Sequence, residues 1–378
     1  MSPRLIALAA GGTGGHVFPA EALAAELAAR GHRLALVTDA RGGAYKGVLG
    51  GLETHHIRAG AVAGRSVVGR VESMVELAIG TWQALGLLKR LDPAAVVGFG
   101  GYPSVPTMLA AVRRGCRTVV HEQNAILGRA NRLLAGRVAR IATSFAQVTG
   151  PGGTALDGAA TLVHTGMPVR PAITALAGRA YLPPAGDGPV NLLVLGGSQG
   201  ARVLSDVVPE ALRRLDRGLL DRLRLAQQCR PEDLDRVRAA YGALGLDADL
   251  APFFDDVPDR LAAAHLVICR SGASTVAETT ALGRPAILVP YPHAADDHQA
   301  ANAAAVAAAG GGWMMRQDRF TPETLAACLS DVLAEPARLQ AAADAARAFG
   351  RPDAAARLAD LVERLMGANG GREGRAAA

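Results

Sequence analysis

The chain has 378 residues, half of them apolar and a fifth charged, so it can bury the cores of two domains of ordinary size. Its formal charge of +6 is carried mostly by arginine. Such a composition is typical of a GC-rich genome, and attraction to anionic lipid or phosphorylated substrates is the functional alternative. The four cysteines lie far apart without a CxxC pair, which argues against a zinc site or a disulfide framework. No apolar stretch reaches ~18 residues, the length of a membrane-spanning helix.

The first half of the chain alternates predicted strands and helices. Strands are expected at 5–10, 34–38, 94–97 and 118–121, and helices at 20–30, which Gly31 closes, and at 71–90. The second half repeats this plan, with strands at 192–195, 223–227, 266–269 and 286–289 and helices at 201–215, 274–282 and 297–309. This alternation predicts an α/β protein with two parallel sheets, each covered on both faces.

We expect an N-terminal domain over residues 1–168 and a second domain over 169–349. A helix near 350–366 is expected to pack back on the first domain, and residues 367–378 to be a disordered tail.

A glycine-rich loop follows the first strand of each half. Residues 11–16 read Gly-Gly-Thr-Gly-Gly-His and residues 196–201 read Gly-Gly-Ser-Gln-Gly-Ala. Glycine lets the backbone approach a ligand, and the helix after each loop presents free N–H groups to anions. The pair predicts two Rossmann-like domains facing one cleft, which suits an enzyme that joins two phosphate-bearing molecules. A dinucleotide site is disfavoured because Val17 stands where the third glycine of the fingerprint falls.

Polar residues follow other predicted strands, where ligands of open α/β sheets bind. In the first half these are Gly100–Ser104, which reads as a turn or a ligand edge, and His121–Asn124, which we do not expect in a core. In the second half, Ser274 or Thr275 is expected to cap a helix. Glu278, near its first turn, could complement the helix dipole or bind ribose hydroxyls. Residues 293–299 form a polar cluster whose spacing fits no standard zinc pattern, so no metal is expected.

Six motifs in order resemble the MurG family of glycosyltransferases. They are the two glycine loops, Gly-Gly-Tyr-Pro-Ser at 100–104, His-Glu-Gln-Asn at 121–124, Cys-Arg-Ser-Gly-Ala-Ser-Thr-Val-Ala-Glu at 269–278 and His-Gln-x-x-Asn-Ala at 298–303. The resemblance covers residues 4–365. It implies the GT-B fold and inverting transfer of N-acetylglucosamine from UDP to the C4 hydroxyl of the muramoyl sugar of lipid I, which forms lipid II. It implies no cofactor.

The resemblance also assigns site residues. The nucleotide is expected at Arg170, its diphosphate at Ser198, uracil at Phe254, ribose at Glu278 and the sugar at Gln299. Further donor contacts are Ala273, Ser274 and Thr275, and the first-domain contacts near the transferred sugar and the acceptor are Thr13, Gly14, Gly15 and Asn124. One departure is Met167, where the family often has asparagine.

Inversion requires a base opposite the departing UDP, and His16 has the only side chain in the first loop with a pKa near neutrality. The N–H groups near Gly197–Gly200 can stabilise the charge that develops on UDP, and the first loop can hold the acceptor diphosphate. His121 and Glu122 are the alternative bases. The competing functions are a UDP-N-acetylglucosamine 2-epimerase of the same fold and a nucleotide-binding regulatory module.

A lipid-linked acceptor implies an anionic membrane surface as partner, at the cytoplasmic face of the inner membrane. The helix at 71–89 carries an apolar stripe, most of which we expect to pack on the sheet, with Ile79 and Trp82 exposed. Basic residues flank this helix and could meet headgroups: Arg65, Arg70, Lys89 and Arg90. Division or elongation proteins are the further partners implied, and nucleic acid is not.

Overall fold

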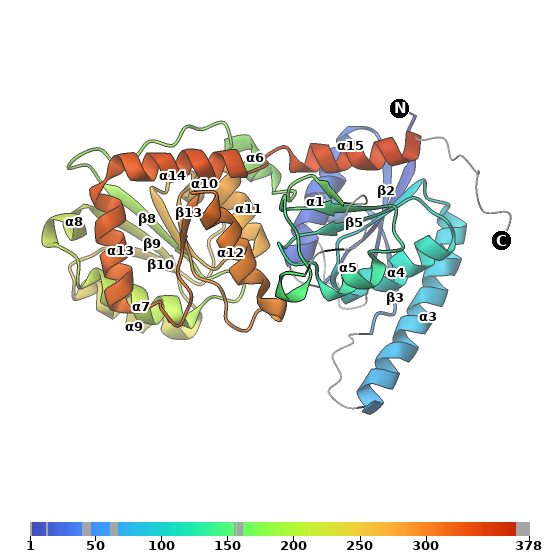
Figure 1. Ribbon diagram of the computed structural model, residues 1–378, viewed down its shortest axis with the longest axis horizontal. Coiled ribbons are helices and arrows are strands. Elements are labelled where there is room, and N and C mark those ends of the chain that lie inside the picture. The colour runs from blue at the N-terminus through green and yellow to red at the C-terminus, as the bar shows by residue number, and fades with distance from the viewer. Residues whose placement is uncertain are drawn as a thin grey trace.

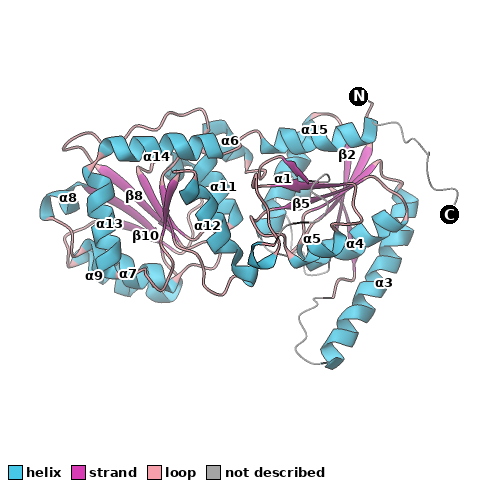
Figure 2. Ribbon diagram, in the orientation of Figure 1, coloured by secondary structure: helices cyan, strands magenta, loops and turns pink. Residues whose placement is uncertain are grey.

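The computed structural model describes residues 2–12, 14–39, 47–60, 67–154, 156 and 162–367. They form two domains side by side, each built on one parallel sheet with helices on its faces (Figure 1 and Figure 2). The predicted α/β class with two Rossmann-like domains is therefore confirmed. The expected tail after Gly367 lies outside the described residues.

The first sheet has seven strands in the order β3-β2-β1-β4-β5-β6-β7. Its strands are β1 (Leu5–Ala9), β2 (Arg33–Asp39), β3 (Glu53–Ile57), β4 (Ala95–Gly98), β5 (Thr118–Glu122), β6 (Arg140–Thr143) and β7 (Leu162–His164). Successive side chains point to opposite faces, so Ile6 and Leu8 join one core layer while Ala7 and Ala9 join the other. Both faces are covered, as a parallel sheet requires.

The helices of the first domain occupy both faces of this sheet. They are α1 (Gly14–Ala29), α2 (Gly47–Gly50), α3 (Val67–Leu91), α4 (Gly101–Arg113) and α5 (Arg129–Leu134), with a short 3-10 helix η1 (Pro151–Gly153). The expected end of α1 is confirmed, because Gly31 has φ +84° and its N–H donates to Ala28 O. Helix α3 extends well beyond the body of the domain (Figure 1).

The second sheet has six strands in the order β10-β9-β8-β11-β12-β13. They are β8 (Val190–Leu195), β9 (Leu223–Gln228), β10 (Ala248–Ala251), β11 (Leu266–Cys269), β12 (Ala286–Leu288) and β13 (Gly312–Met314). The helices around them are α6 (Pro171–Leu176), α7 (Arg202–Leu212), α8 (Arg217–Arg222), α9 (Leu234–Gly242), α10 (Val257–Ala263), α11 (Ala273–Ala281), α12 (His298–Ala308), α13 (Pro322–Ala334) and α14 (Pro336–Phe349), with 3-10 helices η3 (Pro231–Asp233) and η4 (Ala295–Asp297).

The last helix, α15 (Ala354–Gly367), returns from the second domain to the first (Figure 1). Leu358 and Val362 are fully buried in the same core layer as Ile6 and Leu8. The Arg30 guanidinium donates to Asp360 at 2.6 Å and to Glu363 at 2.7 Å, which fixes the helix on α1. The chain therefore crosses between the domains twice.

Strand order places the two glycine loops. In the first sheet β1 lies between β2 and β4, and in the second β8 lies between β9 and β11. The connections leave these central strands in opposite directions, and open α/β sheets bind ligands at such switch points, beyond the carboxyl ends of the strands. The loops that follow β1 and β8 occupy these positions.

Three element predictions were wrong. Helix α1 begins at Gly14 rather than near residue 20, and α4 begins at Gly101, inside a segment that reads as a turn. Strand β3 lies within the glycine-broken stretch 41–69, where no strand was expected. Glycine is a poor helix former, so its clusters hide helix starts that tertiary packing stabilises.

Candidate functional site

The first glycine loop brings His16 into the first turn of α1. Gly12 has φ +85°, and a Cβ on Gly11 would lie 2.8 Å from Thr38 Oγ1, so both positions require glycine. Gly14 and Gly15 are the first residues of the helix, where backbone N–H groups have no partner within the helix. Thr13 lies outside the described residues.

The imidazole of His16 packs against the turn before α4. A Cβ on Gly101 would lie 3.3 Å from His16 Nε2, and one on Gly100 would lie 3.6 Å from Cε1. Both glycines also have positive φ, of +78° and +69°. The positive φ therefore favours glycine at both positions, and at Gly101 the His16 ring also leaves little room for a side chain.

Burial lowers the pKa of His16 below its ordinary value. The negative charge of Glu122 and the polar groups of Phe99 and Gln123 raise this pKa, but burial has the larger effect. Nδ1 is buried and has no hydrogen-bond partner among the described residues. Because burial lowers the pKa, the ring is neutral near pH 7, which is the form that a general base needs.

The segment His121–Gln123 is buried, contrary to the expectation of a ligand edge. His121 Nε2 donates to Gly166 O at 3.1 Å, and its Nδ1 accepts from Gln123 Nε2 at 3.3 Å. Burial lowers the pKa of His121 to about 4. Both nitrogens are occupied and the ring stays neutral, so His121 holds the first domain to the linker and does not serve as the alternative base.

Glu122 is also satisfied inside the domain. Its carboxylate accepts from the N–H groups of Asn124 (2.9 Å) and Gly128 (2.8 Å) and from Asn131 Nδ2 (2.8 Å). These bonds shape the turn that follows β5. Asn124, a predicted substrate contact, lies on that turn with its side chain half-buried.

The second glycine loop is braced by Gln228, which the sequence analysis missed. Gln228 Oε1 accepts from Gly196 N–H at 3.1 Å, and its Nε2 donates to Gly197 O at 3.0 Å and to Pro252 O at 3.1 Å. Ser198 is exposed at the tip of this loop. One side chain thus ties the predicted diphosphate loop to the segment before Phe254.

Helix α11 carries four of the predicted donor contacts, Ala273, Ser274, Thr275 and Glu278. Gly272 is its N-cap and no side chain caps it, so the expected cap at Ser274 or Thr275 was wrong. Ala273, Ser274 and Thr275 form the first turn instead, with partly exposed side chains and N–H groups outside the helical ladder.

Glu278 lies in the second turn of α11 rather than near the first. It receives a bidentate bond from Arg170, with Nε to Oε1 at 2.7 Å and Nη2 to Oε2 at 2.9 Å. The Arg170 guanidinium also lies 5.6 Å from the centre of the Phe18 ring. Phe18 lies two residues after His16, so α1 carries both the base candidate and the first-domain contact of Arg170.

The remaining donor residues lie on two loops. The Phe254 side chain is buried, and the Arg260 guanidinium lies 4.0 Å from the centre of its ring. The neighbouring Phe253 is the exposed residue, with 65% of its surface accessible. Gln299 Oε1 accepts from Tyr291 N–H at 3.0 Å, which fixes the loop before α12. Within the described residues no three metal-ligating side chains gather.

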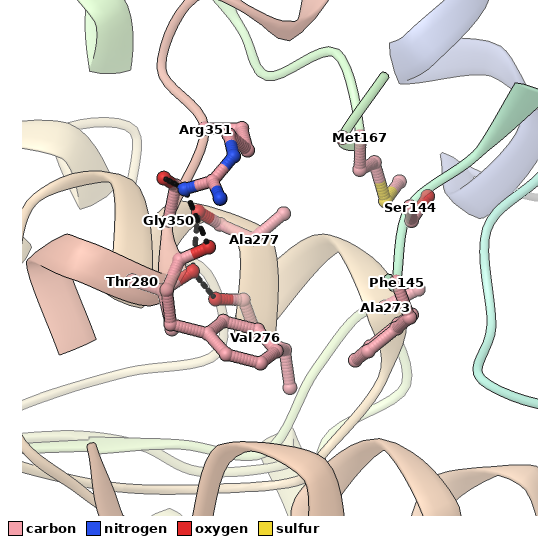
Figure 3. A pocket seen from close by; sticks show the side chains of 11 residues that line it. Ser144, Phe145, Met167, Ala273, Val276, Ala277, Thr280, Gly350 and Arg351 are labelled. Atoms are coloured by element: carbon pink, nitrogen blue, oxygen red, sulfur yellow. Dashed lines mark hydrogen bonds between the residues drawn. The ribbon is translucent and has the colours of Figure 1, made fainter. Parts of the chain in front are cut away.

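Met167 lines a small cavity where the two crossings of the chain meet (Figure 3). The cavity holds about 20 Å³. The linker residue Met167 faces Gly350 and Arg351 of the returning segment across it. A Cβ on Gly350 would collide with Thr280 O, so the returning chain passes α11 without room for a side chain.

Among the described side chains of α3, the large apolar ones that are exposed are Met74 (67%), Val75 and Trp82 (76%). The expected exposure of Trp82 is confirmed, whereas Ile79 is only partly exposed. Lys89 and Arg90 are exposed at the end of the helix, and Arg65 and the Arg70 side chain lie outside the described part of the chain. No helix among the described residues combines the length and apolar character needed to cross a bilayer.

Two family models match the chain: the glycosyltransferase family 28 N-terminal domain over residues 6–143 and the C-terminal domain of the same family over residues 191–358. A protein of Paramagnetospirillum magneticum named UDP-N-acetylglucosamine--N-acetylmuramyl-(pentapeptide) pyrophosphoryl-undecaprenol N-acetylglucosamine transferase is 60% identical over 362 residues, 96% of this chain and 97% of the relative. A protein of the same name from Rhodospirillum rubrum is 60% identical over 361 residues, 96% of this chain and 92% of the relative.

Among solved structures, MurG of Acinetobacter baumannii is 28% identical with a TM-score of 0.76, and the match covers 96% of this chain and 100% of that one. The predicted GT-B arrangement is confirmed by this likeness and by the two parallel-sheet domains. With both domain models matched in order and close relatives along nearly its whole length, the chain belongs to glycosyltransferase family 28.

Proposed function

We propose that the protein transfers N-acetylglucosamine from UDP-N-acetylglucosamine to the C4 hydroxyl of the N-acetylmuramoyl sugar of lipid I and so forms lipid II for peptidoglycan synthesis. The names of the relatives at 60% identity support this reaction. One observation carries it: α1, the helix that holds the neutral His16, meets the Arg170–Glu278 pair across the domain boundary through Phe18. A base on one domain and a ribose-binding carboxylate on the other suit transfer between two bound substrates.

The acceptor hydroxyl attacks C1 of the donor sugar from the face opposite UDP. The bond between C1 and the diphosphate oxygen breaks, UDP leaves with the electron pair, and the configuration at C1 inverts. The hydroxyl proton passes to the neutral imidazole of His16, whose pKa burial lowers. Charge then develops on the diphosphate, where N–H groups of the loop 196–200 and of the first turn of α11 can stabilise it.

The donor is held mainly by the second domain in this proposal. Glu278 accepts the ribose hydroxyls, and Arg170 orients that carboxylate through its bidentate bond. Gln299 and the turn at Ala273–Thr275 face the sugar and diphosphate. The Phe254 side chain is buried, so its backbone is the part that meets uracil.

The acceptor carries a polyprenyl tail, so the enzyme works at the cytoplasmic face of the membrane. Met74, Val75 and Trp82 lie along one side of α3, a helix that projects from the first domain, and they provide an apolar surface for the bilayer (Figure 1). The lipid II that the enzyme forms is used for growth of the cell wall, on which cell shape and division depend. Division or elongation proteins are therefore the expected protein partners.

Transfer of radiolabelled N-acetylglucosamine to lipid I tests the function directly. We expect labelled lipid II and UDP in equal amounts, and release of UDP only when lipid I is present. Formation of N-acetylmannosamine from the donor without any acceptor would instead identify a 2-epimerase. Binding of UDP without turnover under either condition would identify a regulatory module.

A further inference from the structure

Asn302, in the second turn of α12, joins the two domains from a fully buried position. Its Oδ1 accepts from Ala125 N–H at 2.8 Å, and its Nδ2 donates to Asn124 Oδ1 at 3.0 Å and to Ser271 O at 3.1 Å. The side chain has no exposed surface. Two of the three bonds cross from the donor domain to the first domain, and the third holds Asn302 to the segment before α11.

The turn that Asn302 grips also supports His16. Gln123, the neighbour of Asn124, donates to Phe99 O at 2.7 Å, and its Oε1 and the Cε1 of His16 each lie 3.6 Å from the position of a Cβ on Gly100. Glu122 closes the other side of the turn through Asn124 N–H and Gly128 N–H. The turn that Asn302 holds therefore continues along the chain to Gln123, whose side chain lies beside the base candidate.

Ion pairs lie beside the buried hydrogen bonds of Asn302. Asp296, just before α12, receives Arg132 Nη2 at 2.9 Å and lies 3.7 Å from Arg129 Nη2, both from the first domain. Asp297 is held by Arg316 of the donor domain at 3.0 Å. Both aspartates have left-handed backbone, with φ +52° and +53°, which residues other than glycine seldom adopt. Contacts from both domains thus stabilise an unfavourable loop conformation beside Asn302.

We propose that Asn302 is a positioning residue of the transfer reaction: its amide fixes the Asn124–Ala125 turn against the donor domain, so that His16 faces the sugar bound beside α12. This role rests on the proposed function. Gln299 lies one turn before Asn302 on the same helix, so the contact links the sugar side of the site directly to the base side. Reacting atoms misplaced by about 1 Å can lose about 10²-fold in rate.

Asn302→Ala removes the bonds across the domain boundary. We expect kcat to fall by about 10²-fold, while the affinity for UDP measured by calorimetry stays within threefold of wild type. More UDP should be released per sugar transferred, because water competes with a poorly aligned acceptor. Thr279→Ala is the matched control, since Thr279 is equally buried but bonds only within α11. It should lower Tm without changing kcat or the ratio of UDP to product.

A double-mutant cycle with Asn124→Ala isolates the cross-domain bond. The double variant should lose little more than the worse of the two single variants. Independent losses that multiply, or a kcat of Asn302→Ala within twofold of wild type, would overturn the role. Asp296→Asn is the second variant should Asn302→Ala fail to fold, because it removes only the partly exposed ion pair. This variant should have a kcat severalfold below wild type at low ionic strength and equal to wild type at high salt. A kcat equal to wild type at both salt concentrations would also count against the proposal.

A measurement without turnover separates this inference from the function. Spin labels at the exposed positions Arg114 and Arg213, one in each domain, report the distance between the domains once the partly exposed Cys116 and Cys328 are replaced by serine. Asn302→Ala should broaden the distance distribution, and Thr279→Ala should not. An unchanged distribution in Asn302→Ala would overturn the positioning role whatever the substrate is. Wild-type protein that transfers no sugar to lipid I would refute the proposed function alone.

Discussion

Arg170 and Glu278 form a bidentate ion pair, with both nitrogen–oxygen distances below 3 Å, between the interdomain linker and α11. The Glu278 side chain is only 10% exposed, so its carboxylate is held in one orientation. Charge-assisted bidentate pairs add geometric specificity to their energy. The predicted ribose contact is therefore oriented before any donor binds.

Glu278→Ala should raise the KM for the donor and weaken the preference for UDP over 2′-deoxy-UDP donors, because no carboxylate remains to accept the ribose hydroxyls. Arg170→Lys keeps the charge but loses the bidentate geometry, and it should weaken the same preference less. Competition between the two donors measures the effect. If Glu278→Ala rejects the 2′-deoxy donor as strongly as wild type does, the ribose is recognised elsewhere.

His16→Ala should lower kcat by roughly 10²–10⁴-fold and leave UDP affinity nearly unchanged. In wild type, burial lowers the pKa of His16 below 6.5, so most of the base is unprotonated at pH 6.5. Activity should fall only as the pH drops further, and this acid limb should disappear in His16→Ala. Rates measured between pH 5 and 8 test both points, and turnover near wild type would rule out His16 as the base.

Local signals in the sequence account for much of the site. Both glycine loops could be predicted at the carboxyl edges of their sheets, because each follows a short apolar run that is typical of a strand. The glycines that adopt positive φ lie within a few residues of that run, so the signal is local. Glu278 was identified as a candidate, but its partner Arg170 comes from the linker, 108 positions away. Only the resemblance to the family, and not any local pattern, drew attention to that arginine.

The rest depends on contacts between distant segments. Asn302 stands in an alanine-rich helix with no local sign of its three bonds, and Gln228 reads as the polar end of a strand. Four polar residues after an apolar strand predict a ligand edge at His121–Asn124, yet the first three are buried. Their partners are Gly166, Asn131 and Phe99, so the sequence alone does not show that this group is satisfied internally.

The buried His121 should make stability depend on pH. Its pKa of about 4 in the folded protein lies below the ordinary 6.5, so the unfolded chain binds more protons as the pH falls through this window. The contribution is fully present above pH 6.5 and is lost toward pH 4, at up to about 1.4 kcal/mol per pH unit. Urea unfolding should show a shallower pH dependence in His121→Gln, and an unchanged slope would contradict this role. His56→Gln, which removes an exposed imidazole, is the control.

Gly350→Ala should destabilise the protein by about 1–3 kcal/mol, because the added Cβ collides with Thr280 O where the chain returns to the first domain. Gly86→Ala is the matched control: Gly86 lies inside α3 with nothing within 4 Å of a Cβ, so alanine there should stabilise by about 0.5–1 kcal/mol. Urea unfolding of both variants gives the comparison. Equal stability of Gly350→Ala and wild type would mean that the crossing can shift without cost.

The projecting helix α3 gives the last prediction. Trp82 and Met74 are the most exposed large apolar side chains in the described part of this helix, about two turns apart. Replacing both by serine should weaken binding to anionic vesicles, with Tm and UDP affinity preserved, because neither side chain belongs to the core.

Leu87→Ser is the contrasting variant, since Leu87 is buried against the sheet and its loss should lower Tm. Co-sedimentation with vesicles of increasing anionic lipid content measures the effect, and the exposed Lys89 and Arg90 should each add about 1 kcal/mol of attraction where they reach the surface. Vesicle binding by the Trp82→Ser, Met74→Ser variant that equals wild type would place the membrane-binding surface outside α3.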